Sequence, residues 1–249
     1  MIQEYVRAKS KEEVVELVRE GYVILSGGTY LSQHQENVYG LVDIQNIGLN
    51  GISIENHELM VGAGAKFADI VANNLIPESF KEAITQELKP NARNAATIGG
   101  YISVYNRYSN IQAWLTCAQA QVQFFPPEGI YKQEVERFYS ANDNDRLIES
   151  INILPDLKIA WKMVSRTPDD FPLLSIFVND LRDKKTITLI GFSNGFLTFK
   201  LNNDEIAIDK FENILNISHS QYINQFISFN YFKKVAIEIL NELLHVGDK

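Results

Sequence analysis

Near the N-terminus, a pattern of apolar residues with helical spacing is followed by short continuous apolar runs. Residues 10–13 (SKEE) match a capping box, in which a serine and a glutamate cap the first turn of a helix. Apolar residues continue one helical face as far as Gly21, so we predict a helix that ends there. The apolar run at residues 22–25 predicts a strand that leads into two adjacent glycines. Further short strands are expected at residues 41–44, 52–54 and 58–61.

The rest of the chain also contains both helical apolar patterns and short strand-like apolar runs, which predicts an α+β fold. Helices are predicted at residues 67–73, at residues 82–88 and in the segment that ends near Ala118. Strands are predicted at residues 121–125, 147–154, 158–164, 173–179, 186–190 and 196–200. Two helices follow, and the last, at residues 230–244, carries apolar residues at spacings of three and four, which is typical of a helix that packs on a core.

The segment around Pro155 and Asp156 is the best candidate for a domain boundary. At 249 residues the chain is long enough for one large or two ordinary domains. We expect residues 1–154 to form the first domain, with subdomains of about residues 1–55 and 56–154. We expect residues 155–249 to form a smaller C-terminal α+β domain made of a sheet and helices.

Composition and charge exclude several classes of partner. The formal net charge of −8 argues against general affinity for nucleic acid or for an anionic membrane surface. No apolar run reaches the roughly 18 residues of a membrane-spanning helix, and the N-terminus lacks the pattern of a signal peptide. We therefore expect a cytoplasmic protein with no membrane insertion.

Cysteine and histidine usage limits the cofactors that this chain could hold. Cys117 is the only cysteine, so an internal disulfide is impossible, and so is an iron–sulfur cluster held by this chain alone. It lies in an apolar helical pattern, and we expect a buried, unreactive thiol. The four histidines are far apart in sequence and no pair has zinc-ligand spacing. We therefore predict no metal site, and no side chain is singled out as catalytic.

Two glycine stretches carry the densest functional signal. Adjacent glycines let the backbone approach a ligand closely, and consecutive N–H groups in such a turn can converge on an anion such as phosphate. Residues 62–64 (GAG) begin like a dinucleotide fingerprint, but Phe67 occupies the third glycine position and the preceding strands form hairpins, so we reject a Rossmann site there. The two stretches are residues 25–30 (LSGGTY) and residues 92–101 (ARNAATIGGY).

Taken together, the two stretches, their separation and their order resemble the flavin-binding subunit or domain of the molybdenum hydroxylases, the xanthine dehydrogenase family. Residues 24–31 are similar to the family's first loop for the FAD diphosphate, and residues 93–100 are similar to the second loop, nearly unaltered. Residues 147–154 and 161–170 resemble the strand that leads into the family's C-terminal domain and the signature beyond it. The resemblance covers nearly the whole chain. It implies a two-lobed, PCMH-type FAD-binding domain of the vanillyl-alcohol-oxidase-like fold, followed by a smaller α+β domain.

The resemblance also implies a set of FAD-binding residues. Backbone groups of the two glycine stretches would hold the diphosphate, and the hydroxyls of Thr29 and Thr97 would donate hydrogen bonds. Ile148 and Lys162 align with positions that contact the isoalloxazine ring, where a lysine would stabilise the anionic reduced flavin. The full set is Ile24, Leu25, Ser26, Gly27, Gly28, Thr29, Tyr30, Thr97, Gly99, Gly100, Tyr101, Asn110, Ile148 and Lys162.

Three positions depart from the family pattern. Tyr30 and Asn110 each stand where the family has an aspartate, and Tyr101 replaces an asparagine after the second glycine pair. Losing two carboxylates near a diphosphate removes like-charge repulsion, but it also removes hydrogen-bond acceptors for the sugar or the base.

The function that the resemblance implies is electron transfer by an FAD-binding subunit of a hetero-oligomeric complex. A molybdopterin-binding large subunit and an iron–sulfur small subunit would be the partners, and NAD or another molecule would accept the electrons. Two alternatives remain. One is a flavin-free nucleotide-binding or assembly subunit, suggested by the three departures, and the other is a stand-alone flavin oxidoreductase.

Overall fold

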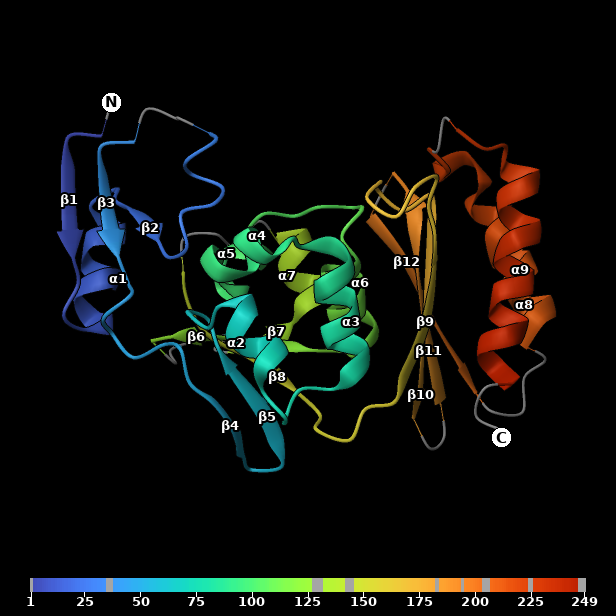
Figure 1. The fold of residues 1–249 in the computed structure, drawn as a ribbon, viewed down its shortest axis with the longest axis horizontal. Helices are drawn as coiled ribbons and strands as arrows, with labels where there is room; N and C mark the ends of the chain where they lie inside the picture. The colour runs from blue at the N-terminus through green and yellow to red at the C-terminus, as the bar shows by residue number, and fades with distance from the viewer. Residues whose placement is uncertain are drawn as a thin grey trace. The chain divides into compact units, whose positions relative to one another are not determined.

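The chain folds into two compact units whose segments alternate along the sequence (Figure 1). The computed structural model describes residues 2–34, 38–126, 132–141, 146–181, 184–193, 195–202, 207–223 and 226–245. The first unit consists of Met1–Ile76, Leu88–Tyr105 and Gln119–Pro155. The second consists of Pro77–Glu87, Asn106–Ala118 and Asp156–Lys249.

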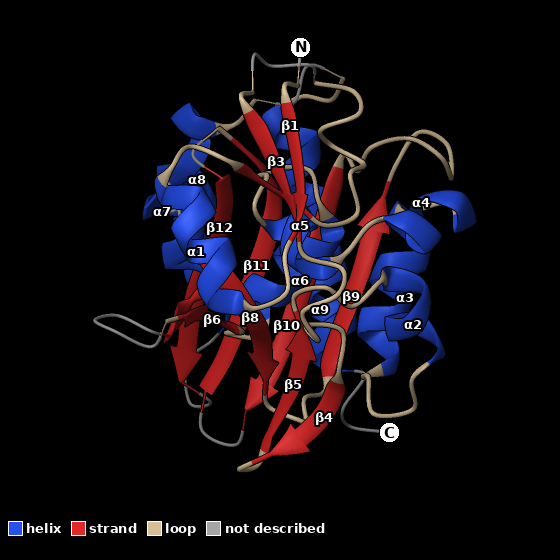
Figure 2. Cartoon of the chain, turned by 90° about the vertical axis from the view of Figure 1, so that its left-hand side faces the viewer, coloured by secondary structure: helices blue, strands red, loops and turns tan. Residues whose placement is uncertain are grey.

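The N-terminal part of the first unit is a small parallel sheet with one helix packed on it (Figure 2). The side chain of Ser10 accepts a hydrogen bond from the backbone N–H of Glu13, so the predicted capping box is confirmed. The parallel pairing was not predicted, because exposed β1 shows no apolar alternation. The elements are β1 (Glu4–Arg7), α1 (Lys11–Arg19), β2 (Val23–Leu25) and β3 (Gly40–Asp43), with strand order β1-β3-β2.

A five-stranded antiparallel sheet forms the rest of the first unit, with strand order β4-β5-β8-β6-β7. Its strand β5 pairs antiparallel with both neighbours, which confirms that the glycines at its end do not belong to a parallel crossover. The strands are β4 (Ile52–Glu55), β5 (Glu58–Gly62), β6 (Gln121–Phe125), β7 (Lys132–Glu134) and β8 (Leu147–Ile153). The helices of this unit that follow β5 are α2 (Phe67–Ala72), α4 (Pro90–Ala95), α5 (Ile98–Ile102) and α7 (Val135–Ala141).

The second unit is a four-stranded antiparallel sheet with helices on both faces (Figure 1). Alternation along β10 explains the two faces. Leu174, Ile176 and Val178 belong to the core that includes α8 and α9, while Ser175 and Asn179 hydrogen-bond to residues of α6. The strands are β9 (Ile159–Val164), β10 (Leu174–Leu181), β11 (Lys184–Phe192) and β12 (Gly195–Asn202). The helices are α3 (Glu78–Glu87), α6 (Asn110–Cys117), α8 (Ala207–Ile217) and α9 (Phe229–His245).

These elements confirm the predicted α+β class. The predicted C-terminal helix at residues 230–244 corresponds to α9, and the predicted burial of Cys117 is observed. In the described part of the chain, no helix combines the length and the apolar character needed to cross a membrane.

Candidate functional site

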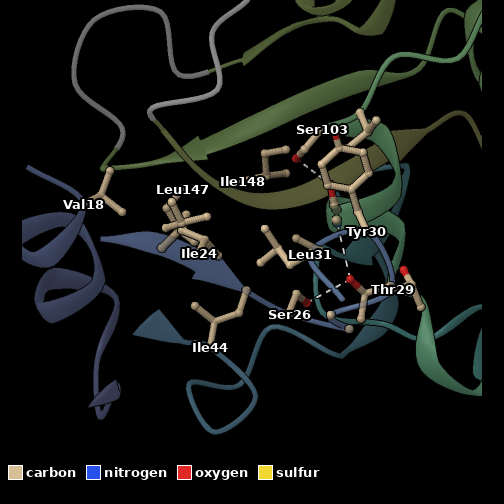
Figure 3. A pocket seen from close by; sticks show the side chains of 18 of the residues that line it. Val18, Ile24, Ser26, Thr29, Tyr30, Leu31, Ile44, Ser103, Leu147 and Ile148 are labelled. Carbon is tan, nitrogen blue, oxygen red and sulfur yellow. Dashed lines mark hydrogen bonds between the residues drawn. The ribbon is translucent and has the colours of Figure 1, made fainter. Parts of the chain in front are cut away.

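The two glycine stretches lie at one cavity of the first unit, with a volume of about 650 Å³ (Figure 3). Strand β2 leads into the first stretch, and the second runs from the end of α4 through Thr97 into α5. Two loops that are far apart in the sequence therefore line the same cavity. Other parts of the wall come from α1 and the residues that lead into β2, from the segments after β3, β5 and α5, and from the start of β8.

The first loop needs its glycines for two different reasons. Gly28 has φ +69°, a conformation that side chains with a Cβ rarely adopt. A Cβ on Gly27 would lie 2.2 Å from the carbonyl oxygen of Ala95, so this residue is a glycine because the backbone before the second loop packs directly on it. The glycines thus fix the shape of the loop and its distance from the second loop.

The second loop begins with a helix cap. Thr97 is the N-cap of α5, and its hydroxyl accepts a hydrogen bond from the backbone N–H of Gly100 at 3.3 Å. A Cβ on Gly99 would lie 2.6 Å from the Cβ of Ala63, so protein packing requires glycine at that position. Gly100 differs, because the nearest atoms to a Cβ there are Thr97 Oγ1 at 3.1 Å and Ser26 Cβ at 3.9 Å. Gly100 is exposed, and the space beside it opens between the two loops.

A side-chain hydrogen bond joins the two loops. Ser26 Oγ and Thr97 Oγ1 lie 2.8 Å apart, although the residues are 71 positions apart in sequence. Gln45, just after β3, donates from Nε2 to the carbonyl oxygen of Ser26 at 3.4 Å. These contacts hold the hydroxyl-bearing loops together at the cavity (Figure 3).

Apolar and hydroxyl-bearing side chains both line the cavity. Figure 3 shows Val18, Ile24 and Leu147 gathered together, while Leu31, Ile44 and Ile148 are spread among the hydroxyls of Ser26 and Ser103. Such a lining suits a ligand that carries both an apolar ring and polar or anionic groups.

Two tyrosines at the cavity, Tyr22 and Tyr30, have different surroundings. The hydroxyl of Tyr22 donates to the Glu4 carboxylate, which raises the pKa of Tyr22 to about 12 and keeps it neutral. Tyr30 is 39% exposed and stacks on His34, with ring centroids 4.0 Å apart. An aromatic platform therefore stands where the family pattern has an aspartate.

Most of the residues predicted to bind the cofactor line this cavity. They are Ile24, Ser26, Gly27, Gly28, Thr29, Tyr30, Thr97, Gly99, Gly100 and Ile148. Leu25 and Tyr101 belong to the same loops but do not line it. The carbonyl oxygen of Leu25 accepts a hydrogen bond from the N–H of Ile44, and the ring of Tyr101 packs edge-on against Phe67 at 5.3 Å.

Asn110 and Lys162 belong to the second unit. Asn110 is 2% exposed, donates from Nδ2 to Met163 Sδ at 3.2 Å and accepts at Oδ1 from the Ser175 hydroxyl at 2.7 Å. The side chain of Lys162 is half-exposed and forms an ion pair with Glu242 on α9. The roles of Asn110 and Lys162 in cofactor binding stay predictions.

Sequence reasoning missed several lining residues. Arg146, Ile44 and the segment at residues 103–105 reach the cavity through the tertiary fold, and no local pattern in the sequence marks them. Arg146 precedes a predicted strand, and an arginine in that position is usually solvated.

The ionisable side chains among the described residues of the lining are three tyrosines, Tyr22, Tyr30 and Tyr105, and one arginine. Among the described residues that line the cavity, none is a histidine, cysteine, aspartate, glutamate or lysine, and Arg146 is the only one that is charged at neutral pH. In the described part of the chain, no group of three or more histidine, cysteine, aspartate or glutamate side chains could hold a metal ion.

Comparisons with known proteins give a consistent picture. Residues 1–156 match the model of a family described as the FAD binding domain in molybdopterin dehydrogenase. The uncharacterized protein YgfM of Escherichia coli K12 is 26% identical over 173 residues, which are 67% of this chain and 65% of that protein, just under two thirds of its length.

Solved structures extend the similarity of fold to nearly the whole chain. Carbon monoxide dehydrogenase from Hydrogenophaga pseudoflava, in a form that lacks the Mo-pyranopterin moiety of the molybdenum cofactor, matches with a TM-score of 0.81 at 18% identity, over 98% of this chain and 96% of that chain. Quinoline 2-oxidoreductase from Pseudomonas putida 86 matches with a TM-score of 0.77 at 14% identity, over 96% of each chain.

Proposed function

Because this chain belongs to the family of the FAD binding domain in molybdopterin dehydrogenase, we propose that it is the FAD-binding electron-transfer subunit of a molybdenum hydroxylase complex. The family assignment confirms the resemblance drawn from the glycine stretches, and it confirms FAD as the cofactor. The proposal adds a route, in which electrons arrive from an iron–sulfur subunit and leave to NAD or another acceptor.

The residues at the cavity fit FAD. The space beside Gly100 is a cradle that a Cβ would fill, and the hydroxyls of Ser26, Thr29 and Thr97 stand around it. Hydroxyls can donate hydrogen bonds to a diphosphate, whereas the N–H groups of Gly99 and Gly100 already donate to the carbonyl oxygen of Ala63 and to Thr97 Oγ1. Ile24 and Ile148 would cover an apolar ring and exclude water from it.

The single observation that carries the proposal is that the two glycine loops meet at one cavity whose described lining holds no histidine, cysteine, aspartate, glutamate or lysine. Such a site leaves the chemistry to a bound cofactor. Bound FAD supplies the capacity to accept electrons and to pass them on as a pair. The protein's own part is to bind, orient and shield that group.

The proposed partners agree with the cysteine content of this sequence. Cys117 is the only cysteine among its 249 residues and is buried, so these residues alone cannot hold an iron–sulfur cluster. We propose an iron–sulfur small subunit and a molybdopterin-binding large subunit as partners, in a cytoplasmic complex. We further propose that Lys162 supports the anionic reduced flavin, for which it would have to leave Glu242.

The test is the visible spectrum of the protein, purified alone and together with its co-expressed genomic neighbours. Flavin bands that follow this chain, and iron–sulfur and molybdopterin subunits that co-purify with it, would support the proposal. A colourless protein that does not take up added FAD would favour the flavin-free subunit. A flavoprotein that oxidises substrates without partner chains would favour the stand-alone oxidoreductase.

A further inference from the structure

The side chain of Tyr30 is a feature of the first glycine loop that diphosphate binding does not explain. Tyr30 ends the loop, directly after Thr29 and before Leu31, and all three residues line the cavity (Figure 3). Tyr30 is 39% exposed. An exposed aromatic ring at the wall of a binding cavity is a surface on which a planar ligand can stack.

His34 stacks on Tyr30 and holds its ring. The ring centroids lie 4.0 Å apart and the ring planes differ by 13°. The carbonyl oxygen of Tyr30 accepts a hydrogen bond from the backbone N–H of His34 at 3.1 Å, and Nδ1 of the same histidine lies 3.1 Å from that oxygen. The backbone N–H of Ser32 donates to the carbonyl oxygen of Gly28 at 3.0 Å, and its hydroxyl donates to that of Thr29 at 3.2 Å. A hydrogen-bonded turn therefore connects the glycine loop to the histidine and holds the two rings together.

The two stacked residues differ in their relation to the cavity. Tyr30 lines the cavity and His34 does not. The imidazole thus covers one face of the tyrosine ring, and a molecule in the cavity would meet the side that remains. Because the turn and the stack orient the ring before a ligand arrives, little side-chain entropy would be lost on binding.

We propose that the Tyr30 ring, supported by His34, stacks on an aromatic ring of the bound dinucleotide. This inference rests on the FAD site proposed above and assigns an affinity-determining role to a position where the family pattern has an aspartate. FAD offers two planar rings, the isoalloxazine and the adenine, and the test decides which of them Tyr30 contacts. Loss of one such stack should weaken FAD binding by about five- to tenfold.

The test compares Tyr30→Ser with Tyr30→Phe in the full chain freed of cofactor. Calorimetry gives the dissociation constants of FAD, of FMN, which carries the isoalloxazine without adenine, and of ADP, which carries adenine without the isoalloxazine. Tyr30→Ser should bind FAD about five- to tenfold more weakly and should lose affinity for only one of the two smaller ligands, which identifies the stacked ring. Tyr30→Phe keeps an aromatic ring and should bind all three ligands like the unchanged protein.

His34→Ala tests the support of the tyrosine ring. This variant should bind FAD about two- to threefold more weakly, because the Tyr30 ring loses the neighbour that orients it. The double variant His34→Ala/Tyr30→Ser should bind FAD no more weakly than Tyr30→Ser alone, since the histidine acts through the tyrosine. An additive loss in the double variant would show that the supporting role of His34 is wrong.

Tyr231 offers a matched control on α9. It is 54% exposed and does not line the cavity, so Tyr231→Ser removes an exposed tyrosine ring elsewhere on the protein. This variant should bind FAD like the unchanged protein. Thermal unfolding without cofactor shows whether each variant is folded.

The outcomes separate this inference from the proposed function. If the unchanged protein binds FAD and Tyr30→Ser binds it equally well, the role of Tyr30 is wrong while the FAD site stands. If Tyr30→Ser loses FMN and ADP to the same extent, the substitution has disturbed the loop, and the inference is overturned. If Tyr30→Phe binds FAD as weakly as Tyr30→Ser, the hydroxyl matters and stacking does not, which also overturns it. If the unchanged protein binds none of the three ligands, both proposals fail.

Discussion

Both units contain polar side chains that form hydrogen bonds inside the protein, but we expect these side chains to have different roles. In the first unit, Ser26 and Thr97 hydrogen-bond across two loops, and glycines keep side chains out of the space beside them. In the second unit, polar side chains under α6 are paired within the protein. Asn110 pairs with Met163 and Ser175, and Asn179 donates to the carbonyl oxygen of Cys117 at 3.0 Å, while the buried Oδ1 of Asn179 has no hydrogen-bond partner.

The difference lies in what surrounds the polar atoms. Glycines in the first region leave room beside the hydroxyls of Ser26 and Thr97, so a ligand can reach them. Side chains in the second region fill the interior, so their hydrogen bonds serve packing and specificity. The two regions predict opposite responses to substitution, with loss of binding in the first and loss of stability in the second.

Gly100→Val should have the largest effect. Its Cβ would lie 3.1 Å from Thr97 Oγ1 and would occupy the space between the loops. We expect FAD binding to weaken by about 100-fold or more, which corresponds to about 3 kcal/mol, in a variant that still folds. Titration with FAD measures the loss of binding, and thermal unfolding without FAD shows whether the variant still folds.

Gly51→Val is the control for that substitution. A Cβ on Gly51 has no atom within 4 Å, and the residue is exposed in the same unit. It should bind FAD normally. Full FAD occupancy in Gly100→Val would show that the second loop does not face the diphosphate. The expectation that substitutions in the first region reduce binding would then be wrong.

Removing the hydrogen bond between the loops should have an intermediate effect. Ser26→Ala and Thr97→Ala should each weaken FAD binding by about tenfold, because each removes a hydroxyl at the cavity. The double variant should be less than additive by about 1 kcal/mol if the bond positions both loops. Strict additivity in FAD titrations would mean that the two hydroxyls act independently.

Asn110→Ala addresses the second region. The substitution leaves the buried hydroxyl of Ser175 without its acceptor, so the free energy of unfolding should fall by about 1–3 kcal/mol. Denaturant unfolding of the protein without cofactor measures this loss. Unchanged stability together with weaker FAD binding would contradict the structural role and would support the predicted cofactor contact.

The smallest expected effect is that of a thiol reagent on Cys117. Burial raises the pKa of the Cys117 thiol to about 12, so at pH 8 the native protein should hold almost no thiolate. Because the folded pKa lies above the unfolded one, any contribution of this group to stability is present below about pH 9 and is lost as the pH rises. Alkylation should be complete in denaturant and absent without it. Rapid native labelling would show that the interior under α6 opens readily.

Sequence patterns predicted most of the regular elements because their signals are local. The capping box at Ser10, the strand before the first glycine pair and the amphipathic helix α9 each depend on residues a few positions apart. Strand β1 and the short helices α4 and α5 were missed, because they have few residues and no clear period. Their conformations depend on contacts with distant segments.

The sequence by itself determined the family and the two glycine loops, since the tolerance of glycine for a positive φ, as at Gly28, and the lack of a Cβ at Gly100 are properties of single residues. Only the tertiary structure decided which atoms meet. It brought Thr97 to Ser26, set the carbonyl of Ala95 against Gly27, and placed Arg146 over Phe124 at the cavity. The physical reason is that packing between strands and loops far apart in sequence fixes these contacts, and no local pattern of residues records it.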